Sequence, residues 1–310
     1  MRTFADLGEA LLDVVRARSR LHGWRIQALF EAVAASLGRV RLLKTEDAGD
    51  VYYAGASIKP PDFRVVTSDG EQVLIEVKSF HPKRPDDPFT MRRKDVDELV
   101  GYAALTGVAT VKVAVYWSAW NLWTLTDVSA LGAHEPRRVG IALPDAMKAN
   151  EMVIVGDRLI GTEWPLALTL YADTSKPRGV DAEGEAVFTI GAAKYSVAGR
   201  TITRGEEQQI AHRLMLYGRW TEETPVEMAD GDIVSVSFSF APEQPPPQPP
   251  ALHGALSSIY SSMFNHATLD DEGEITELRM DVDPGALGSL IPDDYEGETL
   301  RIWRFQLRPP

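Results

Sequence analysis

The side chains best suited to chemistry in this chain are two carboxylates and one amine, Asp62, Glu76 and Lys78. Between them lies Ser68-Asp69-Gly70, which suits a three-residue hairpin loop closed by a glycine in the left-handed region. In such a hairpin the paired residues have numbers that sum to 138, so Asp62 falls opposite Glu76, with Cβ atoms roughly 5 Å apart. Lys78 lies on the same side as Glu76 because side chains alternate along a strand. The spacing predicts that all three groups share one face.

The other face of this hairpin is apolar. It pairs Val65 with Val73 and Phe63 with Ile75, which suits packing against a core. A register slip of one residue would turn the acids into that core. The hydrophobic pattern and the turn therefore indicate the same register.

Two carboxylates opposite each other on a sheet normally destabilise it. A divalent cation between them removes that cost, and Mg²⁺ prefers carboxylate oxygens while keeping several waters. A neighbouring lysine can orient or deprotonate a water, or offset charge on a phosphate. The alternative interpretation is an exposed acidic edge with a solvated lysine.

An Asp followed across a hairpin by Glu-x-Lys, here Pro61-Asp62 and Glu76-Val77-Lys78, resembles the motif of the PD-(D/E)xK nuclease superfamily. The resemblance covers roughly residues 20–130. It implies an α+β fold with a restriction-endonuclease-like αβββαβ core and a mixed sheet. It also implies a Mg²⁺-dependent endonuclease, with Mn²⁺ as a substitute, that cuts DNA rather than RNA, in phage defence, restriction or repair.

The resemblance assigns roles to individual residues. Asp62 and Glu76 are the expected metal ligands, with the carbonyl of Val77 as a third, and Lys78 is expected beside the attacking water and the scissile phosphate. In the family a Glu from the first core helix often completes the site. Glu31 is the candidate, with Glu9 of the preceding helix as a weaker one, and an ordinary exposed helix glutamate remains the alternative for Glu31.

A basic run, Arg92, Arg93 and Lys94, is expected to begin the helix after the hairpin. A helix N-terminus that also carries cations can hold a phosphate of a nucleic acid. The alternative is a solvated run flanked by Asp86, Asp87, Asp95 and Asp97.

Composition places the chain among soluble globular proteins. Of 310 residues, 44% are hydrophobic and 25% are charged, both ordinary values. With no cysteine, the chain has no disulfide and no thiolate metal site. The six histidines lack ligand spacing, which argues against zinc. No apolar run predicts a membrane span and no signal-peptide pattern begins the chain, so a cytoplasmic location is expected.

Charge is distributed unevenly. Residues 1–172 hold 21 Lys and Arg against 22 Asp and Glu, a net charge of −1, whereas residues 173–310 hold 11 against 23, a net charge of −12. We expect 1–172 to be the nuclease-like domain, and 173–310 an acidic α+β domain with a Pro-rich segment at 242–250. Because a polyanion avoids an acidic surface, the second domain is expected to bind a protein partner, support a homo-oligomer or regulate the site. A catalytically inactive scaffold subunit is the alternative for the whole chain.

Hydrophobic periodicity predicts the elements that position the motif. The expected elements of the first domain are helices at 3–20, 24–37 and 90–106, with a break at His22-Gly23, and strands at 39–44, 51–55, 111–117, 122–125, 152–156 and 166–172. Those of the second domain are strands at 186–190, 194–203, 233–240, 274–280 and 298–307, and helices at 205–217 and 253–264.

Overall fold

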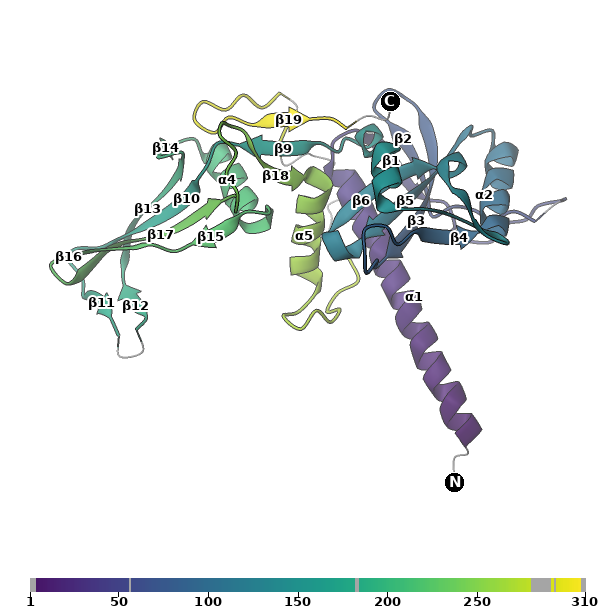
Figure 1. Ribbon diagram of the computed structural model, residues 1–310, viewed down its shortest axis with the longest axis horizontal. Coiled ribbons are helices and arrows are strands. Elements are labelled where there is room, and N and C mark those ends of the chain that lie inside the picture. Colours follow the sequence, from purple (N-terminus) through teal and green to yellow (C-terminus); the bar gives the residue numbers. More distant parts are fainter. Residues whose placement is uncertain (1–3, 56, 182–183, 280–290, 293, 308–310) are drawn as a thin grey trace. The chain divides into compact units, whose positions relative to one another are not determined.

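The chain folds into two compact units with mixed α+β architecture (Figure 1). The computed structural model describes residues 4–55, 57–181, 184–279, 291–292 and 294–307, with side chains described from Arg20 onward. The first unit comprises Met1–Arg158, Tyr260–Ser289 and Gln306–Pro310, and the second comprises Leu159–Ile259 and Leu290–Phe305. Among the described residues, no helix is both long and apolar enough to cross a membrane.

The first unit is built on a five-stranded sheet in the order β1-β2-β3-β5-β6. Its strands are β1 (Val40–Thr45), β2 (Phe63–Thr67), β3 (Gln72–Phe80), β5 (Thr110–Trp117) and β6 (Leu122–Asp127). β3 and β5 are parallel, and the other neighbours are antiparallel. The sheet is therefore mixed, with a helical crossover between its two parallel strands.

The β2–β3 hairpin has the predicted register. Phe63 pairs with Ile75 and Val65 with Val73, and Gly70 closes the turn with φ +89°. Its N–H donates to the Thr67 carbonyl at 3.0 Å. Turn geometry and hydrophobic pattern therefore fix the position of Glu76 in the ladder.

Helix α1 (Phe4–Ser36) is continuous, so the predicted break at His22-Gly23 is wrong. Gly23 keeps helical geometry, and a Cβ added there would meet nothing within 4 Å. The helix packs on the sheet through buried Phe30, whose ring centroid lies 5.7 Å from that of Phe63 and 5.4 Å from that of Trp123. This packing positions the polar side of α1 beside the end of β2.

A second core lies between the sheet and helix α2 (Arg93–Thr106). Buried Leu99 and Ala103 of α2 join Leu74, Val113 and Trp117 of the sheet. The helix begins three residues later than predicted because Phe89–Arg92 forms strand β4. β4 pairs with β8 (Arg138–Ile141), which also pairs with β7 (Gly132–Glu135).

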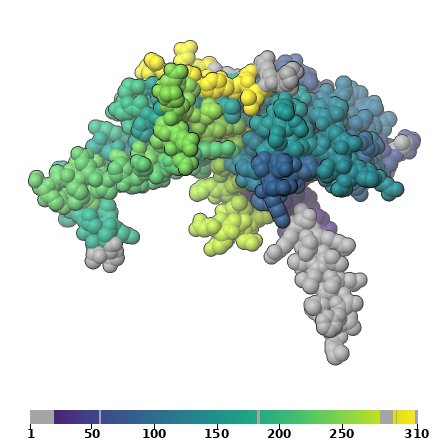
Figure 2. Space-filling view, viewed as in Figure 1, coloured from purple at the N-terminus to yellow at the C-terminus, as the bar shows by residue number. Residues whose placement is uncertain are grey.

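Helix α5 (Leu256–Thr268) begins in the second unit and enters the first at Tyr260. Within the first unit, Trp123 Nε1 donates to Ser261 Oγ at 2.9 Å, and Arg25 Nη2 donates to Thr268 Oγ1 at 3.0 Å. Helix α5 is the yellow-green helix labelled in Figure 1, and its residues are among the yellow-green atoms in Figure 2. A segment expected to belong to the second domain therefore completes the core of the first. The other helices described in this unit are short: η1 (Ser118–Trp120), η2 (Val128–Ala130), α3 (Leu143–Lys148) and η3 (Met152–Ile154).

The described residues of the second unit form a six-stranded antiparallel sheet and two smaller sheets. The large sheet comprises β10 (Leu166–Ala172), β13 (Ile190–Val197), β14 (Arg200–Ile202), β15 (Thr221–Glu223), β16 (Val226–Ala229) and β17 (Asp232–Ala241). β9 (Leu159–Thr162) pairs with β18 (Ala251–Ala255) and β19 (Trp303–Phe305), while β11 (Arg178–Val180) pairs with β12 (Ala186–Phe188). Helix α4 (Gly205–Tyr217) packs against β10.

Several expectations at the domain boundary are wrong. Residues 166–172 form β10 of the second unit's sheet and 152–154 form helix η3, so neither segment extends the first sheet. The compact units accordingly divide after Arg158, not near 172. Residues 51–55 are not a strand, and 274–279 make only an isolated bridge at Ile275, while residue 280 lies outside the described residues.

Candidate functional site

Asp62 lies just before β2 and takes the place of a backbone group in the sheet. Its Oδ2 accepts the Val77 N–H at 2.6 Å, so the side chain continues the β2–β3 ladder. Its Oδ1 accepts a hydrogen bond from Gln27 Nε2 of α1, also at 2.6 Å. Only 6% of Asp62 is exposed. Both oxygens are therefore held in fixed directions at the end of the hairpin.

Glu76 is fully buried in β3. Its Oε1 accepts hydrogen bonds from two ammonium groups, Lys78 Nζ at 2.5 Å and Lys59 Nζ. Its Oε2 is buried and has no hydrogen-bond partner in the described part of the chain. A buried carboxylate oxygen without a donor is costly, and this oxygen keeps its capacity to accept a further group.

The two lysines reach Glu76 from different elements. Lys78 is two residues further along β3, and its Nζ also donates to the Val77 carbonyl at 3.1 Å. Lys59 belongs to the segment before β2, which is held by a backbone hydrogen bond from the Lys59 N–H to Glu98 of α2 at 3.2 Å. About a third of each side chain is exposed. Both ammonium groups therefore face a site that solvent can enter.

The charges in this cluster are coupled. Burial, with the negative charge of Glu76 adding to it, raises the pKa of Asp62 to about 6, although Lys78 and the Val77 N–H act in the opposite direction. Burial alone would lower the pKa of Lys59, but the attraction and hydrogen bond of Glu76 outweigh it and raise that pKa. The two lysines thus partly offset the negative charges of the two acids. This reduces the electrostatic cost of burying the acids side by side.

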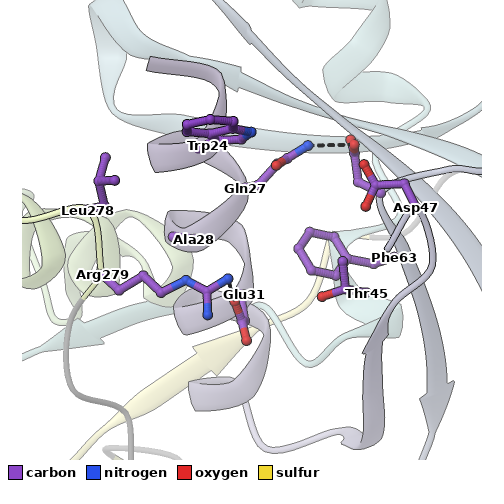
Figure 3. Close-up of a pocket in the computed structure, with 10 residues that line it drawn as sticks. Trp24, Gln27, Ala28, Glu31, Thr45, Asp47, Phe63, Leu278 and Arg279 are labelled. Carbon is purple, nitrogen blue, oxygen red and sulfur yellow. Dashed lines mark hydrogen bonds and ion pairs between the residues drawn. The ribbon is translucent and has the colours of Figure 1, made fainter. Parts of the chain in front are cut away.

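A cavity of about 370 Å³ opens beside Asp62 and is lined from α1, β1, β2 and residues 278–279 (Figure 3). Its lining residues are Trp24, Gln27, Ala28, Glu31, Thr45, Asp47, Asp62, Phe63, Leu278 and Arg279. Desolvation, with the negative charge of Glu76 adding to it, raises the pKa of Asp47. Asp47 is therefore a third carboxylate, close enough for its charge to interact with that of Glu76.

Glu31 lines this cavity together with Asp62, but its described partner is Arg279, whose Nη2 lies 3.8 Å from Glu31 Oε2. Figure 3 shows the Arg279 guanidinium beside it. The α1 residue that contacts Asp62 is Gln27, one turn earlier. Whether Glu31 completes a metal site stays a prediction, and Glu9 lies outside the residues whose side chains are described.

The basic run at the start of α2 is exposed and partly paired. Arg92 makes two hydrogen bonds to Asp95, at 2.8 and 2.9 Å, and Lys94 Nζ lies 3.5 Å from Glu98 Oε1. Arg93 is the first residue of the helix and is exposed. This arrangement agrees with a run flanked by acids, and phosphate binding by these three residues stays a prediction.

The residues present fit a hard divalent cation. Asp62, Glu76 Oε2 and the Val77 carbonyl supply oxygen atoms only, the donor type that Mg²⁺ prefers, and the unpartnered oxygen is one of them. Among the described residues, no group of three or more Asp, Glu, His or Cys side chains gathers closely enough to hold a metal by side chains alone. A cation here would therefore keep several waters, as Mg²⁺ commonly does.

Sequence reasoning missed three residues of this cluster: Gln27, Asp47 and Lys59. Gln27 lies on the same side of α1 as Glu31, the residue of this helix that was expected at the site. Lys59 precedes Pro60-Pro61-Asp62, so its proximity to the motif was a usable signal. Asp47 offered none, because a loop residue is positioned by the path of the chain and not by periodicity.

No protein-family model matches the chain, and no curated protein matches it. The case for a function therefore depends on the geometry of the site.

Proposed function

We propose that the first unit is a metal-dependent nuclease of the PD-(D/E)xK kind that hydrolyses phosphodiester bonds in DNA. The observation that carries the proposal is the buried Asp62–Glu76 pair, which leaves Glu76 Oε2 without a donor beside two partly exposed lysines. The order of elements, α1, three strands, α2 and β5, supports a restriction-endonuclease-like core, with β4 added before α2.

In this proposal Asp62, Glu76 and the Val77 carbonyl hold Mg²⁺. The ion would lower the pKa of a bound water and offset negative charge on the scissile phosphate. Gln27 and the Val77 N–H fix the two Asp62 oxygens in place. Preorganised groups of this kind act without reorganising during the reaction.

Lys78 and Lys59 supply the positive charge. Their ammonium groups meet at Glu76 Oε1, so a phosphate that approaches the acids also approaches two cations. Charge placed where negative charge develops stabilises the transition state more than the ground state. The same lysines reduce the repulsion that two buried acids would otherwise exert on a polyanion.

The test is cleavage of supercoiled plasmid, linear duplex, single-stranded DNA and RNA, each with Mg²⁺, with Mn²⁺ and with EDTA. We expect metal-dependent cleavage of DNA that Lys78→Ala reduces at least about a hundredfold, the effect of losing one preorganised charge. Glu76→Gln should abolish it. Glu71→Gln, an exposed acid of the same hairpin, is the matched control and should cleave normally.

A metal-binding measurement separates the chemistry from the site. Mn²⁺ should raise the Tm of the parent and of Lys78→Ala, and raise it less in Asp62→Asn. Full cleavage by Lys78→Ala or Glu76→Gln would contradict the site assignment.

A second candidate, a catalytically inactive scaffold on the same fold, is favoured by one observation. Lys59 and Lys78 both bind Glu76 Oε1, so much of its charge is offset without a metal. In that case Mn²⁺ would shift the Tm of neither the parent nor Glu76→Gln, and no substrate would be cut.

A further inference from the structure

The cavity beside Asp62 has a composition that the hydrolysis itself does not require. Trp24, Ala28, Phe63 and Leu278 give it apolar walls. Trp24 is 56% exposed and is the last residue of an exposed stretch of α1, residues 20–24, before the buried residues that follow it. An exposed indole beside a cavity is a stacking platform, since every nucleic-acid base offers a π-face to it.

The stripe on α1 that faces the cavity is continuous. Trp24, Gln27, Ala28 and Glu31 are spaced three and four residues apart, so their side chains lie on one side of the helix. Figure 3 shows them between Leu278 and Arg279 on one side and Thr45, Asp47 and Phe63 on the other. Because α1 is continuous here, the backbone that positions Gln27 against Asp62 also positions Trp24, one turn earlier.

The charge of the cavity selects the part of a nucleotide that fits it. Its described lining has three carboxylates, Glu31, Asp47 and Asp62, against one guanidinium, Arg279. Such a lining repels a phosphate, which is instead attracted to Lys59 and Lys78 at the buried pair. An uncharged base has no such penalty, can stack on Trp24 and can hydrogen-bond to the polar rim. The volume of about 370 Å³ falls within the usual range for small-ligand pockets.

We propose that this cavity binds an unpaired nucleobase adjacent to the scissile phosphate, with Trp24 as its stacking residue. The proposal rests on the proposed nuclease site and adds its substrate class: single-stranded DNA, or duplex with an unpaired base beside the cleaved bond. A base in a perfect duplex is stacked and paired, and it reaches such a pocket only after unpairing at a cost.

Binding is measured in the Glu76→Gln background with EDTA, so the result does not depend on catalysis. The probes are a fluorescein-labelled single-stranded oligonucleotide, the same strand with a row of abasic positions, and its blunt duplex. We expect the single strand to bind most tightly. Trp24→Ala should weaken that binding about tenfold, Trp24→Phe should retain most of it, and neither should change binding of the abasic strand.

Leu105→Ala on α2 is the matched control, because it removes another exposed apolar side chain of the first unit. It should leave binding of every probe unchanged. Tm measurements on each variant check that folding is intact. We expect the Trp24 variants to fold, because the side chain that they change is exposed. Binding of the single strand should also quench tryptophan emission, and this quenching should be smaller in Trp24→Phe.

The outcomes separate the two proposals. Trp24-dependent binding of the single strand without any cleavage supports the subsite and contradicts the nuclease. Metal-dependent cleavage together with equal binding of parent and Trp24→Ala supports the nuclease and overturns the subsite. Tighter binding of an arginine-rich peptide than of the single strand would also overturn it, since an acidic cavity with an indole can take a cation instead.

Discussion

At the scale of single residues, the site is an acidic pair stabilised by groups from three elements. The hairpin alone would place Asp62 and Glu76 opposite each other, and the turn chemistry was sufficient to predict that. What makes the pair stable is Gln27 on α1 and Lys59 in the segment before β2. Lys59 lies near Asp62 in the sequence and Gln27 lies near Glu31, but the contacts that they make depend on how the chain packs, which local periodicity does not encode. The motif was therefore predictable, whereas for its support the sequence offered candidate residues but not their contacts.

The raised pKa of Asp62 predicts a pH dependence of stability. Its folded pKa of about 6 lies above the unfolded value near 4, so the folded state binds the proton more tightly. The resulting stabilisation is complete below about pH 4 and is lost as pH rises through about 6. We expect the free energy of unfolding without metal to fall by up to about 2 kcal/mol over that range.

Urea unfolding at several pH values in EDTA measures this effect. Asp62→Asn should flatten the profile between pH 4 and 6, whereas Asp69→Asn, at the hairpin turn, should not. A parent whose stability rises steadily across this window would contradict the assignment.

The position of Lys59 predicts that its ammonium group competes with the proposed metal ion for the Glu76 carboxylate. Its ammonium group binds the same carboxylate that is proposed to hold the ion, so Lys59→Ala should lower stability in EDTA by about 1 kcal/mol, an amount reduced by the solvent exposure of the lysine. Removing that charge should also tighten Mn²⁺ binding several-fold. Calorimetric titration tests this, with Lys44→Ala as the control, and weaker Mn²⁺ binding would show that Lys59 assists the metal instead.

At the scale of elements, the strands around the motif were predictable because turn residues and alternation agree there. The ends of helices were not. Gly23 was interpreted as a break, yet α1 continues through it. Burial of residues on its C-terminal side, such as Leu29 and Phe30, stabilises the helix there. Likewise Phe89–Arg92 has the composition of a helix start but pairs with β8. In both cases tertiary packing overrides local preference.

The continuity of α1 can be tested at Gly23. Glycine costs a helix interior roughly 0.5–1 kcal/mol relative to alanine, and no atom would obstruct a Cβ at this position. Gly23→Ala should therefore raise the free energy of unfolding by about that amount, measured by the urea midpoint at constant m-value. Destabilisation would indicate a bend at this residue, as the sequence first suggested.

At the scale of the whole molecule, the first unit is discontinuous in sequence. Residues 159–259 form most of another compact unit, after which Tyr260–Thr268 returns to supply the partners of Trp123 and Arg25. A boundary placed after 166–172, because strands at 152–156 and 166–172 were expected to extend the first sheet, assumes that each domain is one stretch of chain. No local sequence pattern shows that a later segment packs back into the first unit, so the sequence suggested one domain boundary near 172.

This arrangement predicts the behaviour of a fragment. A chain cut after residue 172 lacks α5 and leaves the Nε1 of Trp123 and the guanidinium of Arg25 without their partners. Unpaired buried polar groups of this kind cost about 1–3 kcal/mol each. We expect fragment 1–172 to lack the near-ultraviolet circular dichroism of the intact protein and to unfold at lower urea, while fragment 1–279 should resemble it more closely. A fragment 1–172 as stable as the full chain would contradict this.

The interrupted path of the first unit also constrains its timing on the ribosome. Its α1 and central sheet, which ends at Asp127, leave the exit tunnel first, and Ser261 follows only after about 130 more codons are read. At typical translation rates that delay is on the order of ten seconds. During this interval the nascent chain carries Asp62, Glu76 and Lys78 without the contacts that α5 makes to Trp123 and Arg25, so the unit that holds the proposed site is completed only after residues 159–259 have been made.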